Sequence, residues 1–596
     1  MEDRETPSPK NTAKGPGKNG SDERKSVPKE TSIKTRPVQL LIAPRKVGDV
    51  APMAADVLLN ALAAYPDVRI VKHIRPSAFG ALSTGSGTAD DVVVAETSPE
   101  RAAAIQNSAG NAIVVERNVR LRHLGMAIPG NPNGDIHETV IPTGIGLPGT
   151  AANSVAVTFK VTDAGGQGIA ACEVFCYSGG FPATALTGAD GAATVNLPQS
   201  TIHSIDFVYV KPRADFWEKW IIRPVLDIDS FNVLTLQPLS SFAPAGFPGN
   251  PFFGWGEKTM NLDQQQLTGA GARIGIIDSG CDNTHPALTH VQSGVDYTNI
   301  DNAGNADTTT WVNDEICHGT HCAGVICGNG NGGIRGFAPA ADVHALKLFP
   351  GGRFDSLVSA IKYAIDHQFD VVNCSLGTPE SSEVVQSWME RARQAGVAVV
   401  VAAGNSSGPV QFPATAPGVL AVSAFGRQGA YPDDTYHAQT VPVGVSGTIG
   451  VNGIFAPKFT CHGPEIDVCG PGVAIISSVP GGGYAAWDGT SMAAPHITGL
   501  VALLAAHHPE FSNKNAPRNA ARVDRLFQTI IGSATGVGLD PTYAGSGVPD
   551  TVTAVSGGIT VNPNSIGIDV QELTKLIQTV VMTTVNPVRQ RSATLM

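Results

Sequence analysis

The sequence predicts an α/β domain with a mainly parallel sheet over residues 243–535, preceded by a small α+β domain and a small β-sandwich. Three observations predict this order. Residues 37–125 contain a short alternation of strand and helix patterns, and residues 150–242 have the two-residue period of antiparallel strands. Residues 243–535 alternate apolar strands with amphipathic helices, which is typical of a parallel sheet covered on both faces.

The composition narrows the class of protein. The chain has 596 residues, with 40 Lys and Arg against 51 Asp and Glu, so its formal charge is −11. This negative balance argues against a nucleic-acid backbone as the main partner. Hydrophobic residues make up 42% of the chain and charged residues only 15%, which excludes a chain that is disordered throughout. No apolar run approaches the roughly 18 residues that span a bilayer, so we expect no membrane partner.

The N-terminal residues and the number of cysteines indicate the cellular compartment in which we expect the protein. Residues 1–36 are rich in Lys, Glu, Ser and Pro and predict a disordered tail. The chain begins without the apolar segment of a signal peptide, and nine cysteines are few for its length. We therefore expect a cytoplasmic protein, with secretion as the alternative. Cys461 and Cys469 would be candidates for a disulfide only in an exported protein.

The first predicted domain, residues 37–125, has strands and helices in the order β-α-β-β-α-β. This is the order of a small ferredoxin-like α+β domain. Its second helix carries start signals, with Ser98 as the N-cap, Pro99 at the first helical position and Glu100 in the first turn. Residues 126–149 are rich in Pro and Gly and predict a linker.

The second predicted domain, residues 150–242, consists of short strands with Gly-rich turns, and Asp190-Gly191 is a hairpin signal. We interpret it as a small β-sandwich, similar to the immunoglobulin-like or transthyretin-like modules found on many bacterial enzymes. Nothing in this segment predicts chemistry.

The third predicted domain, residues 243–535, contains the chemistry-bearing residues at its strand ends. One apolar strand ends at Asp278, and a second, almost purely apolar strand ends just before Asn405. Between them a helix is predicted to begin at Asp355, which we expect to be its N-cap. Residues 536–596 are polar and Gly-rich, and we interpret them as a tail that contains one helix.

Three side chains of this domain are those that nucleophilic acyl transfer needs. Asp278 lies at the carboxyl end of a strand, where active sites form in open α/β sheets. His318 opens a helical segment, and Ser491 lies in a Gly-rich turn before a long apolar helix. An imidazole can take the proton of a serine hydroxyl, and a carboxylate can fix the tautomer of that imidazole. The Asn405 amide could donate a hydrogen bond to an oxyanion.

The motifs around these residues resemble those of the subtilisin-like serine proteases. They are DSG at Asp278, HGTHCAG at His318, AAGN ending at Asn405, and GTSMAAPH around Ser491. The resemblance covers about half of the chain. It implies Asp278 as the orienting acid, His318 as the general base and Ser491 as the nucleophile. It also implies that Asn405 and the Ser491 backbone N–H form the oxyanion hole.

The same resemblance implies the substrate-binding residues. One short strand would pair with the substrate backbone and border the S1 pocket, and a second segment would form the opposite wall of that pocket. These residues are Ser375, Leu376 and Gly377 for the strand, Ala402, Ala403 and Gly404 for the wall, and Gln411 and Phe412 near the pocket floor.

Cys322 lies four residues after His318, one helical turn away. The thiol-bearing, proteinase K-like subtilases have a Cys at this place, which implies that mercurials perturb the enzyme. Two residues depart from the family pattern. Cys317 stands where a Gly usually precedes the His, and Thr378 stands where a second Gly often follows SLG.

The resemblance extends upstream of the α/β domain. Residues 37–125 look like the inhibitory propeptide of the family. This implies a self-inhibited precursor whose own N-terminal domain is a partner, with self-cleavage near His123 or Leu124. The β-sandwich between propeptide and protease is an unusual order.

A Cys/His cluster near the predicted base raises the question of zinc. Its members are Cys317, His318, His321, Cys322 and Cys327. One short helix would supply all of these ligands, whereas structural zinc sites usually draw paired ligands from separated segments. We therefore do not expect zinc.

The Gly-rich stretch from Gly328 matches G-x-G-x-x-G but lacks the preceding strand and following helix that nucleotide binding requires. In the family this region often binds calcium, and Asn329 and Asn331 could supply oxygen ligands. We expect no cofactor to be needed for the chemistry, and a structural calcium stays open.

The sequence thus predicts a serine endopeptidase that hydrolyses peptide or protein substrates. Two alternatives remain. A peptide ligase or macrocyclase would pass the same acyl-enzyme to an amine instead of water. A non-catalytic peptide-binding module is the other alternative, and the complete triad argues against it.

Overall fold

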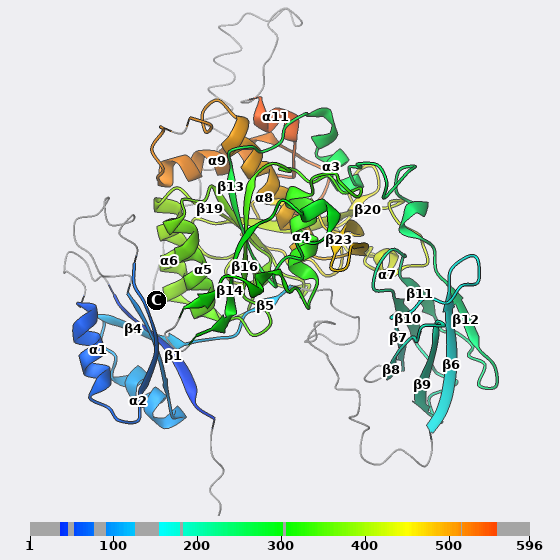
Figure 1. Ribbon diagram of the computed structural model, residues 1–596, viewed down its shortest axis with the longest axis horizontal. Coiled ribbons are helices and arrows are strands. Elements are labelled where there is room, and N and C mark those ends of the chain that lie inside the picture. The colour runs from blue at the N-terminus through cyan, green and yellow to red at the C-terminus, as the bar shows by residue number, and fades with distance from the viewer. Residues whose placement is uncertain are drawn as a thin grey trace, which may run out of the picture.

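The computed structural model describes residues 36–45, 53–76, 91–124, 154–178, 183–301, 305–513 and 515–556. Three folded parts follow one another along the chain, and Figure 1 shows the first beside α5 and α6 and the second beside α7. The predicted tail up to residue 35, the predicted linker 126–149 and the helix predicted within the last residues lie outside the described ranges. No helix in those ranges has both the length and the apolar character needed to cross a bilayer.

The N-terminal domain is a four-stranded antiparallel sheet with two helices, in the strand order β2-β3-β1-β4. Its elements are β1 (Val38–Pro44), α1 (Ala55–Ala63), β2 (Arg69–Ile74), β3 (Val92–Thr97), α2 (Pro99–Ser108) and β4 (Ile113–Arg117). The predicted cap of α2 is confirmed, because Ser98 Oγ accepts a hydrogen bond from Arg101 N at 3.2 Å. The chain continues from β4 as an extended segment, residues 118–124, which contains β5 (Arg122–His123).

The β-sandwich has two sheets with the orders β11-β10-β7-β8 and β12-β6-β9. The strands are β6 (Ser154–Thr162), β7 (Glu173–Tyr177), β8 (Ala183–Leu186), β9 (Ala192–Pro198), β10 (Phe207–Lys211), β11 (Lys219–Ile222) and β12 (Asn232–Thr235). Apolar residues of both sheets form one core, which includes Val157, Phe159, Val174, Val195 and Val208. The turn at Asp190-Gly191 joins β8 to β9, and Gly191 has a φ of 81° there.

The α/β domain is built on a nine-stranded sheet in the order β15-β14-β16-β13-β17-β19-β20-β21, with β22 also paired to β20. The strands are β13 (Arg273–Asp278), β14 (Ser293–Ile300), β15 (Ala306–Asp307), β16 (Asp342–Lys347), β17 (Val371–Cys374), β19 (Ala398–Ala402), β20 (Leu420–Arg427), β21 (Ile454–Phe455) and β22 (Val468–Pro471). Only the pairs β14–β15 and β20–β21 are antiparallel. The predicted mainly parallel sheet is therefore confirmed.

Helices cover both faces of this sheet. The main ones are α4 (His318–Cys327), α5 (Phe354–Asp366), α6 (Glu383–Gln394), α8 (Thr490–His507) and α9 (Ala520–Ser533). The shorter elements are α3 (Trp255–Thr259), α7 (Tyr436–Gln439), α10 (Pro541–Ala544), α11 (Thr551–Val555) and the pairs β23 (Ile475–Val479) with β24 (Gly483–Trp487) and β25 (Ala534–Thr535) with β26 (Val548–Pro549). Neighbouring strand residues alternate between two cores: Val400 packs with α4 and α8, and Val401 packs with α5 and α6.

Two sequence expectations about this domain are wrong. The domain does not end at residue 535, because β25 pairs with β26 and because Val548 and Ala554 are buried in its core. These contacts make residues 536–556 part of the α/β domain. Asp355 is not the N-cap of α5, since Arg353 occupies that position. The Asp355 N–H instead donates to Asn118 Oδ1 of the extended segment at 3.2 Å, so a distant part of the chain supplies the cap.

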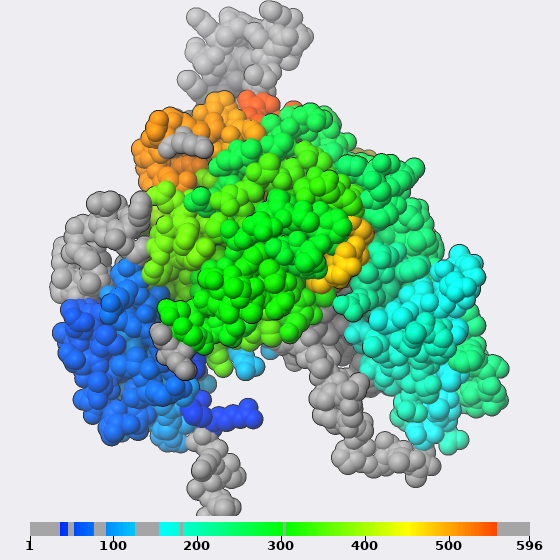
Figure 2. All heavy atoms as spheres, viewed as in Figure 1, coloured from blue at the N-terminus to red at the C-terminus, as the bar shows by residue number. Residues whose placement is uncertain are grey.

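The N-terminal domain packs against α5 and α6 (Figures 1 and 2). Arg45 forms a two-bonded ion pair with Glu383 at 2.8 and 2.7 Å. Glu116 accepts from the Ser382 hydroxyl and from Glu383 N, the latter at 3.0 Å, at the start of α6. A carboxylate at this place also interacts favourably with the helix dipole.

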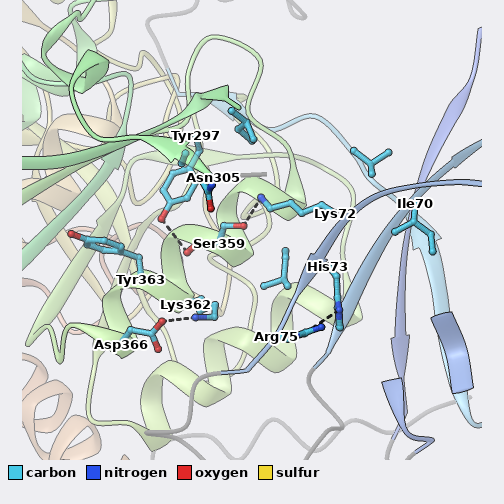
Figure 3. Close-up of a pocket in the computed structure, with 14 residues that line it drawn as sticks. Ile70, Lys72, His73, Arg75, Tyr297, Asn305, Ser359, Lys362, Tyr363 and Asp366 are labelled. Carbon is cyan, nitrogen blue, oxygen red and sulfur yellow. Dashed lines mark hydrogen bonds and ion pairs between the residues drawn. The ribbon is translucent and has the colours of Figure 1, made fainter. Parts of the chain in front are cut away.

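A cavity of about 650 Å³ lies between β2 and α5, next to these contacts (Figure 3). Lys72 reaches from β2 to the Ser359 hydroxyl at 2.8 Å and lies 3.7 Å from the Asp355 carboxylate. Polar contacts thus surround this open space. Beside it, buried apolar residues of the N-terminal sheet, among them Leu41, Val92 and Val94, share one hydrophobic core with α5 and α6.

We expect Glu116→Ala to loosen the first turn of α6, because two donors there lose their acceptor. The loss in free energy of the closed turn should be about 1–2 kcal/mol, which corresponds to a roughly 5–30-fold larger population of the open turn. Amide hydrogen exchange of residues 382–385 in the full-length chain measures this effect. The matched control Arg69→Gln removes an exposed ion pair with Glu96 elsewhere in the domain and should leave exchange in this turn unchanged. Unchanged protection in Glu116→Ala would contradict the interpretation.

Candidate functional site

The site lies at the carboxyl end of β13, where the strand order reverses. β13 lies between β16 and β17, and the chain builds the sheet first on one side of β13 and then on the other. Such a switch point is where open α/β sheets bind ligands. Asp278 is the last residue of β13 and is buried there.

Asp278 and His318 form a buried pair. His318 is the first residue of α4, and its Nδ1 lies 2.8 Å from Asp278 Oδ1 and 2.9 Å from Oδ2. Since an ionised carboxylate only accepts, Nδ1 carries the proton that is shared with Asp278. Burial alone would raise the pKa of Asp278, but His318 outweighs it and holds that pKa below its ordinary value. Burial opposes a charge on His318 as well, yet the Asp278 carboxylate raises the pKa of the imidazole above its ordinary value.

Cys317, which precedes the histidine, adopts a left-handed conformation with a φ of 69°. The resemblance implies a glycine at this position, and a glycine would adopt this positive φ without strain. Cys322 lies one turn into α4, as predicted, and its thiol is 3.9 Å from His318 Nδ1.

Ser491 is the second residue of α8 and is fully buried. The backbone position of the serine is held from two sides, because its carbonyl accepts from Ser375 Oγ at 3.0 Å and from the Cys322 thiol at 3.5 Å. His318 and Ser491 thus both contact the same thiol. His318 Nε2 is buried and has no hydrogen-bond partner among the described residues.

Asn405 is oriented by a residue that the sequence analysis did not select. Its Oδ1 accepts from both the N–H and the hydroxyl of Thr490, each at 2.9 Å. This turns Nδ2 outward, where it donates to the backbone carbonyl of Leu124 at 2.8 Å. The only sequence signal for Thr490 was its place beside Ser491 in the motif.

The extended segment 118–124 enters the site from the N-terminal domain. β5 pairs antiparallel with β18 (Leu376–Gly377), with His123 opposite Leu376 and Arg122 opposite Gly377. Leu124 N donates to Ser375 O at 3.3 Å. The Leu124 carbonyl oxygen accepts from Ser491 Oγ at 2.8 Å as well as from Asn405.

The Leu124 side chain lies against the residues expected at the S1 pocket. Its Cδ2 is 3.4 Å from the position that a Cβ on Gly377 would take, and the Gln411 side chain is 2.9 Å from the same position. Gln411 also borders Gly404, at 2.9 Å from the Cβ position there. The absence of a side chain at Gly377 therefore leaves room beside the leucine.

The remaining predicted pocket residues lie in the hydrophobic cores beside the sheet or next to the pocket. Ala402 ends β19 and packs in one core, and Ala403 packs in the other. Gln411 N donates to Ala403 O at 2.9 Å, which brings Gln411 beside the pocket. Thr378 and Phe412 exchange two backbone hydrogen bonds, of 2.8 and 3.0 Å. The strand pairing therefore continues at the position where Thr378 stands in place of the usual Gly.

Among the described residues, only Asp278, His318 and Cys322 form a group of His, Cys, Asp or Glu with metal-ligand spacing, and these residues belong to the site itself. His321 of the Cys/His cluster instead stacks on Trp487 at 4.6 Å. The Asn329 Oδ1 of the predicted calcium loop accepts from Asn331 N at 2.8 Å. A calcium ion at this loop stays a prediction.

This arrangement can perform acyl transfer. The Leu124 carbonyl lies against a hydroxyl and an amide donor, and the buried histidine–carboxylate pair is connected to the same serine through the Cys322 thiol. An Asn side chain aimed at a carbonyl oxygen is placed to stabilise the negative charge that develops there when a nucleophile attacks.

Comparison with known proteins agrees with this geometry. Residues 269–550 match the family model described as the subtilase family (Peptidase_S8). The chain is 34% identical to the subtilisin of Bacillus pumilus over 262 residues, which are 43% of this chain and 84% of that protein. It is 29% identical to the major intracellular serine protease of Bacillus subtilis (strain 168) over 300 residues, 49% of this chain and 84% of that protein.

The match to subtilisin E of Bacillus subtilis (strain 168) is 34% identical over 265 residues and covers 43% of this chain, but it spans only 61% of that relative. The matched region of this chain contains Asp278, His318, Asn405 and Ser491, and the strands that carry them form the parallel sheet described above. From the family match and the identity to the Bacillus pumilus protein, we conclude that the chain belongs to the subtilase family.

Proposed function

We propose that this protein is a serine endopeptidase that is made as a self-inhibited precursor. The observation that carries the proposal is the position of Leu124. Its carbonyl oxygen accepts from Ser491 Oγ and from Asn405 Nδ2, both at 2.8 Å, while the residues before it pair with β18 as a strand. A peptide substrate bound by strand addition would present its carbonyl in the same way.

In the proposed reaction Ser491 Oγ attacks the carbonyl carbon and His318 Nε2 takes the hydroxyl proton. Asn405 Nδ2 and the N–H of Ser491 stabilise the oxyanion, and Asp278 stabilises the imidazolium that forms. His318 then gives the proton to the leaving amine, which leaves an acyl-enzyme on Ser491. Water, activated by the same imidazole, hydrolyses the ester and restores the hydroxyl.

The bond that follows Leu124 is the first one that this site would cut. The extended segment connects the N-terminal domain to the site, so the domain would deliver its own C-terminal segment as an intramolecular substrate. After cleavage the domain could remain bound through its contacts with α5 and α6 and block other substrates. The β-sandwich follows the cut in the sequence and would stay attached to the mature enzyme.

The leucine in the site also bears on substrate preference. The pocket beside Gly377 holds an aliphatic side chain of this size, and the Gln411 amide borders it. We propose a preference for leucine or a similar aliphatic residue before the cleaved bond. Peptide ligation through the same acyl-enzyme is the alternative outcome, and the mass of the product distinguishes the two by the gain or loss of water.

We also propose a reducing compartment as the working place of the enzyme. All nine cysteines are free thiols, including Cys461 and Cys469. A relative that matches over 84% of its length is an intracellular serine protease. An exported protein stays the alternative.

We expect Ser491→Ala to accumulate as an intact precursor, because the variant has no hydroxyl to attack the Leu124 carbonyl. The wild-type protein should show a new N-terminus immediately after Leu124. Intact mass spectrometry of both proteins, with fluorophosphonate labelling of the mature wild type, measures this. Removal of the N-terminal domain by purified Ser491→Ala alone would contradict self-processing, and an unlabelled mature wild type would favour a binding module.

Asn405→Ala should lower kcat about 10²–10³-fold with little change in KM, because the lost hydrogen bond strengthens only as the oxyanion forms. This range is the one known for the oxyanion-hole asparagine of subtilisin itself. Steady-state kinetics on a leucine-containing peptide measures the effect. A loss confined to KM would show that Asn405 binds the ground state only.

Gly377→Ala should lower kcat/KM for a peptide with leucine before the cleaved bond about 10-fold relative to one with alanine, since a methyl group there would narrow the pocket. The control Gly408→Ala places its methyl group 3.8 Å or more from other atoms and should leave the ratio unchanged. Equal ratios in both variants would place the leucine pocket elsewhere.

A further inference from the structure

The β-sandwich contacts the α/β domain beside α7, through β11 and the loop before it (Figure 1). Trp220 N donates to Asp434 O at 2.7 Å, and the Lys219 ammonium pairs with the Asp434 carboxylate at 2.6 Å. The rings of Trp220 and Tyr436 lie 5.3 Å apart. On the other side of the contact, Asp215 and Tyr484 exchange two hydrogen bonds, of 2.6 and 3.0 Å.

A cluster of charged side chains is buried at the centre of this contact. His437 of α7 is fully buried, and its Nδ1 lies 2.7 Å from Asp488 Oδ1. Its Nε2 lies 3.7 Å from Oε1 of Glu218, a residue of the β-sandwich. The same Glu218 oxygen accepts from His437 N at 3.2 Å, and its other oxygen accepts from the Tyr209 hydroxyl at 2.5 Å.

The cluster ends three residues before the nucleophile. Asp488 follows β24 and precedes Gly489, the N-cap of α8, and Ser491 is the second residue of that helix. Asp488 Oδ1 also accepts from Ala474 N at 2.6 Å, so the carboxylate joins two chain segments. The position of Asp488 therefore sets where the turn that leads to Ser491 begins.

Neither domain can form this cluster alone. The α/β domain supplies a cation between one carboxylate of its own and one of the β-sandwich. A buried pair that loses one partner leaves an uncompensated charge, which is strongly unfavourable. The triad chemistry described above makes no use of Glu218, His437 or Tyr209.

We propose that Glu218 is a positioning residue for the reaction: through His437 it holds Asp488, and with it the turn that carries Ser491, so the β-sandwich completes the active site. This inference rests on the proposed peptidase activity. It makes the β-sandwich an integral part of the mature enzyme and not an independent substrate-binding module. The unusual place of this domain, between propeptide and peptidase, agrees with a role that persists after processing.

The charge state of His437 gives the proposal a distinct signature. Burial opposes the charge, but Asp488 and Glu218 outweigh it and raise the pKa of His437 to about 9. The ion pairs are therefore lost as the pH rises through about 9 and His437 gives up its proton. Burial also raises the pKa of Glu218 above its ordinary value, so the Glu218 pair weakens in turn when this carboxyl takes up a proton at low pH. The other titratable groups near the cluster are Tyr431 and Tyr436 beside His437, and Tyr209 and Lys211 on β10 near Glu218.

The test compares mature Glu218→Gln with Lys219→Gln, which removes the Asp434 ion pair from the same interface but does not contact His437. For each protein, kcat and KM on a leucine-containing peptide and the pH dependence of Ser491 phosphonylation are measured. In Glu218→Gln we expect kcat to fall about 10-fold with KM nearly unchanged. Its alkaline limb should begin at lower pH than in the wild type, because His437 loses one of its two carboxylates. Lys219→Gln should match the wild type in both.

Equal kcat and equal pH profiles in Glu218→Gln and Lys219→Gln, with a labelled wild type, would overturn the inference and leave the peptidase proposal intact. A mature wild type that fluorophosphonate does not label would overturn both. If Glu218→Gln does not fold, Tyr209→Phe takes its place, because it keeps the carboxylate and removes one hydrogen bond to it. We then expect kcat to fall about 3-fold, and a wild-type kcat in Tyr209→Phe would overturn the inference.

Discussion

The buried hydrogen bond between Asp278 and His318 is the interaction on which the candidate site depends. A carboxylate with 1% of its side chain exposed is stable as an ion only if groups around it replace water. Here the His318 imidazole and the N–H of Ser279, at 2.8 Å, do so. The pair forms because β13 ends at the switch point of the sheet and because α4 begins there. The sheet order and the start of α4 thus determine the site more than any single side chain does.

The N-terminal segment uses the same site through backbone contacts. β5 adds to β18 as an antiparallel strand, and the Leu124 carbonyl lies between Ser491 and Asn405. Strand addition requires little of the side chains except at the pocket, where Leu124 is buried. Backbone pairing therefore holds the segment along the site, and the pocket selects the side chain of Leu124. α5 receives its cap from Asn118 because the segment passes the start of that helix on its way to the site.

The β-sandwich shows how a domain without catalytic motifs can bear on catalysis. Its core is its own, but one edge carries Glu218 into a cluster with His437 and Asp488. Charged groups in such a place are costly unless each has its partners, so the two domains must meet with the correct geometry. Association of the domains and placement of the turn before Ser491 are in this way linked.

The sequence by itself determined the features that local patterns encode. Apolar strands such as that before Asn405 predicted a parallel sheet, which is confirmed, because strands buried on both faces must be apolar throughout. Ser98 was recognised as a helix cap because a cap uses a side chain close to the helix start. The motifs placed Asp278, His318, Ser491 and Asn405, and the structure brings them together, while their roles in the reaction stay proposals.

Only the tertiary structure decided the features that join distant segments. The cap of α5 comes from Asn118, which accepts from Asp355 N although the two residues are 237 positions apart in the chain, and the last strand pair makes residues 536–556 part of the α/β domain. Thr490 orients Asn405, and Glu218 faces His437, through contacts that no periodicity records. The physical reason is that local sequence encodes which surfaces are apolar and where helices begin, whereas hydrogen bonds between buried polar groups are chosen by packing after those surfaces have met.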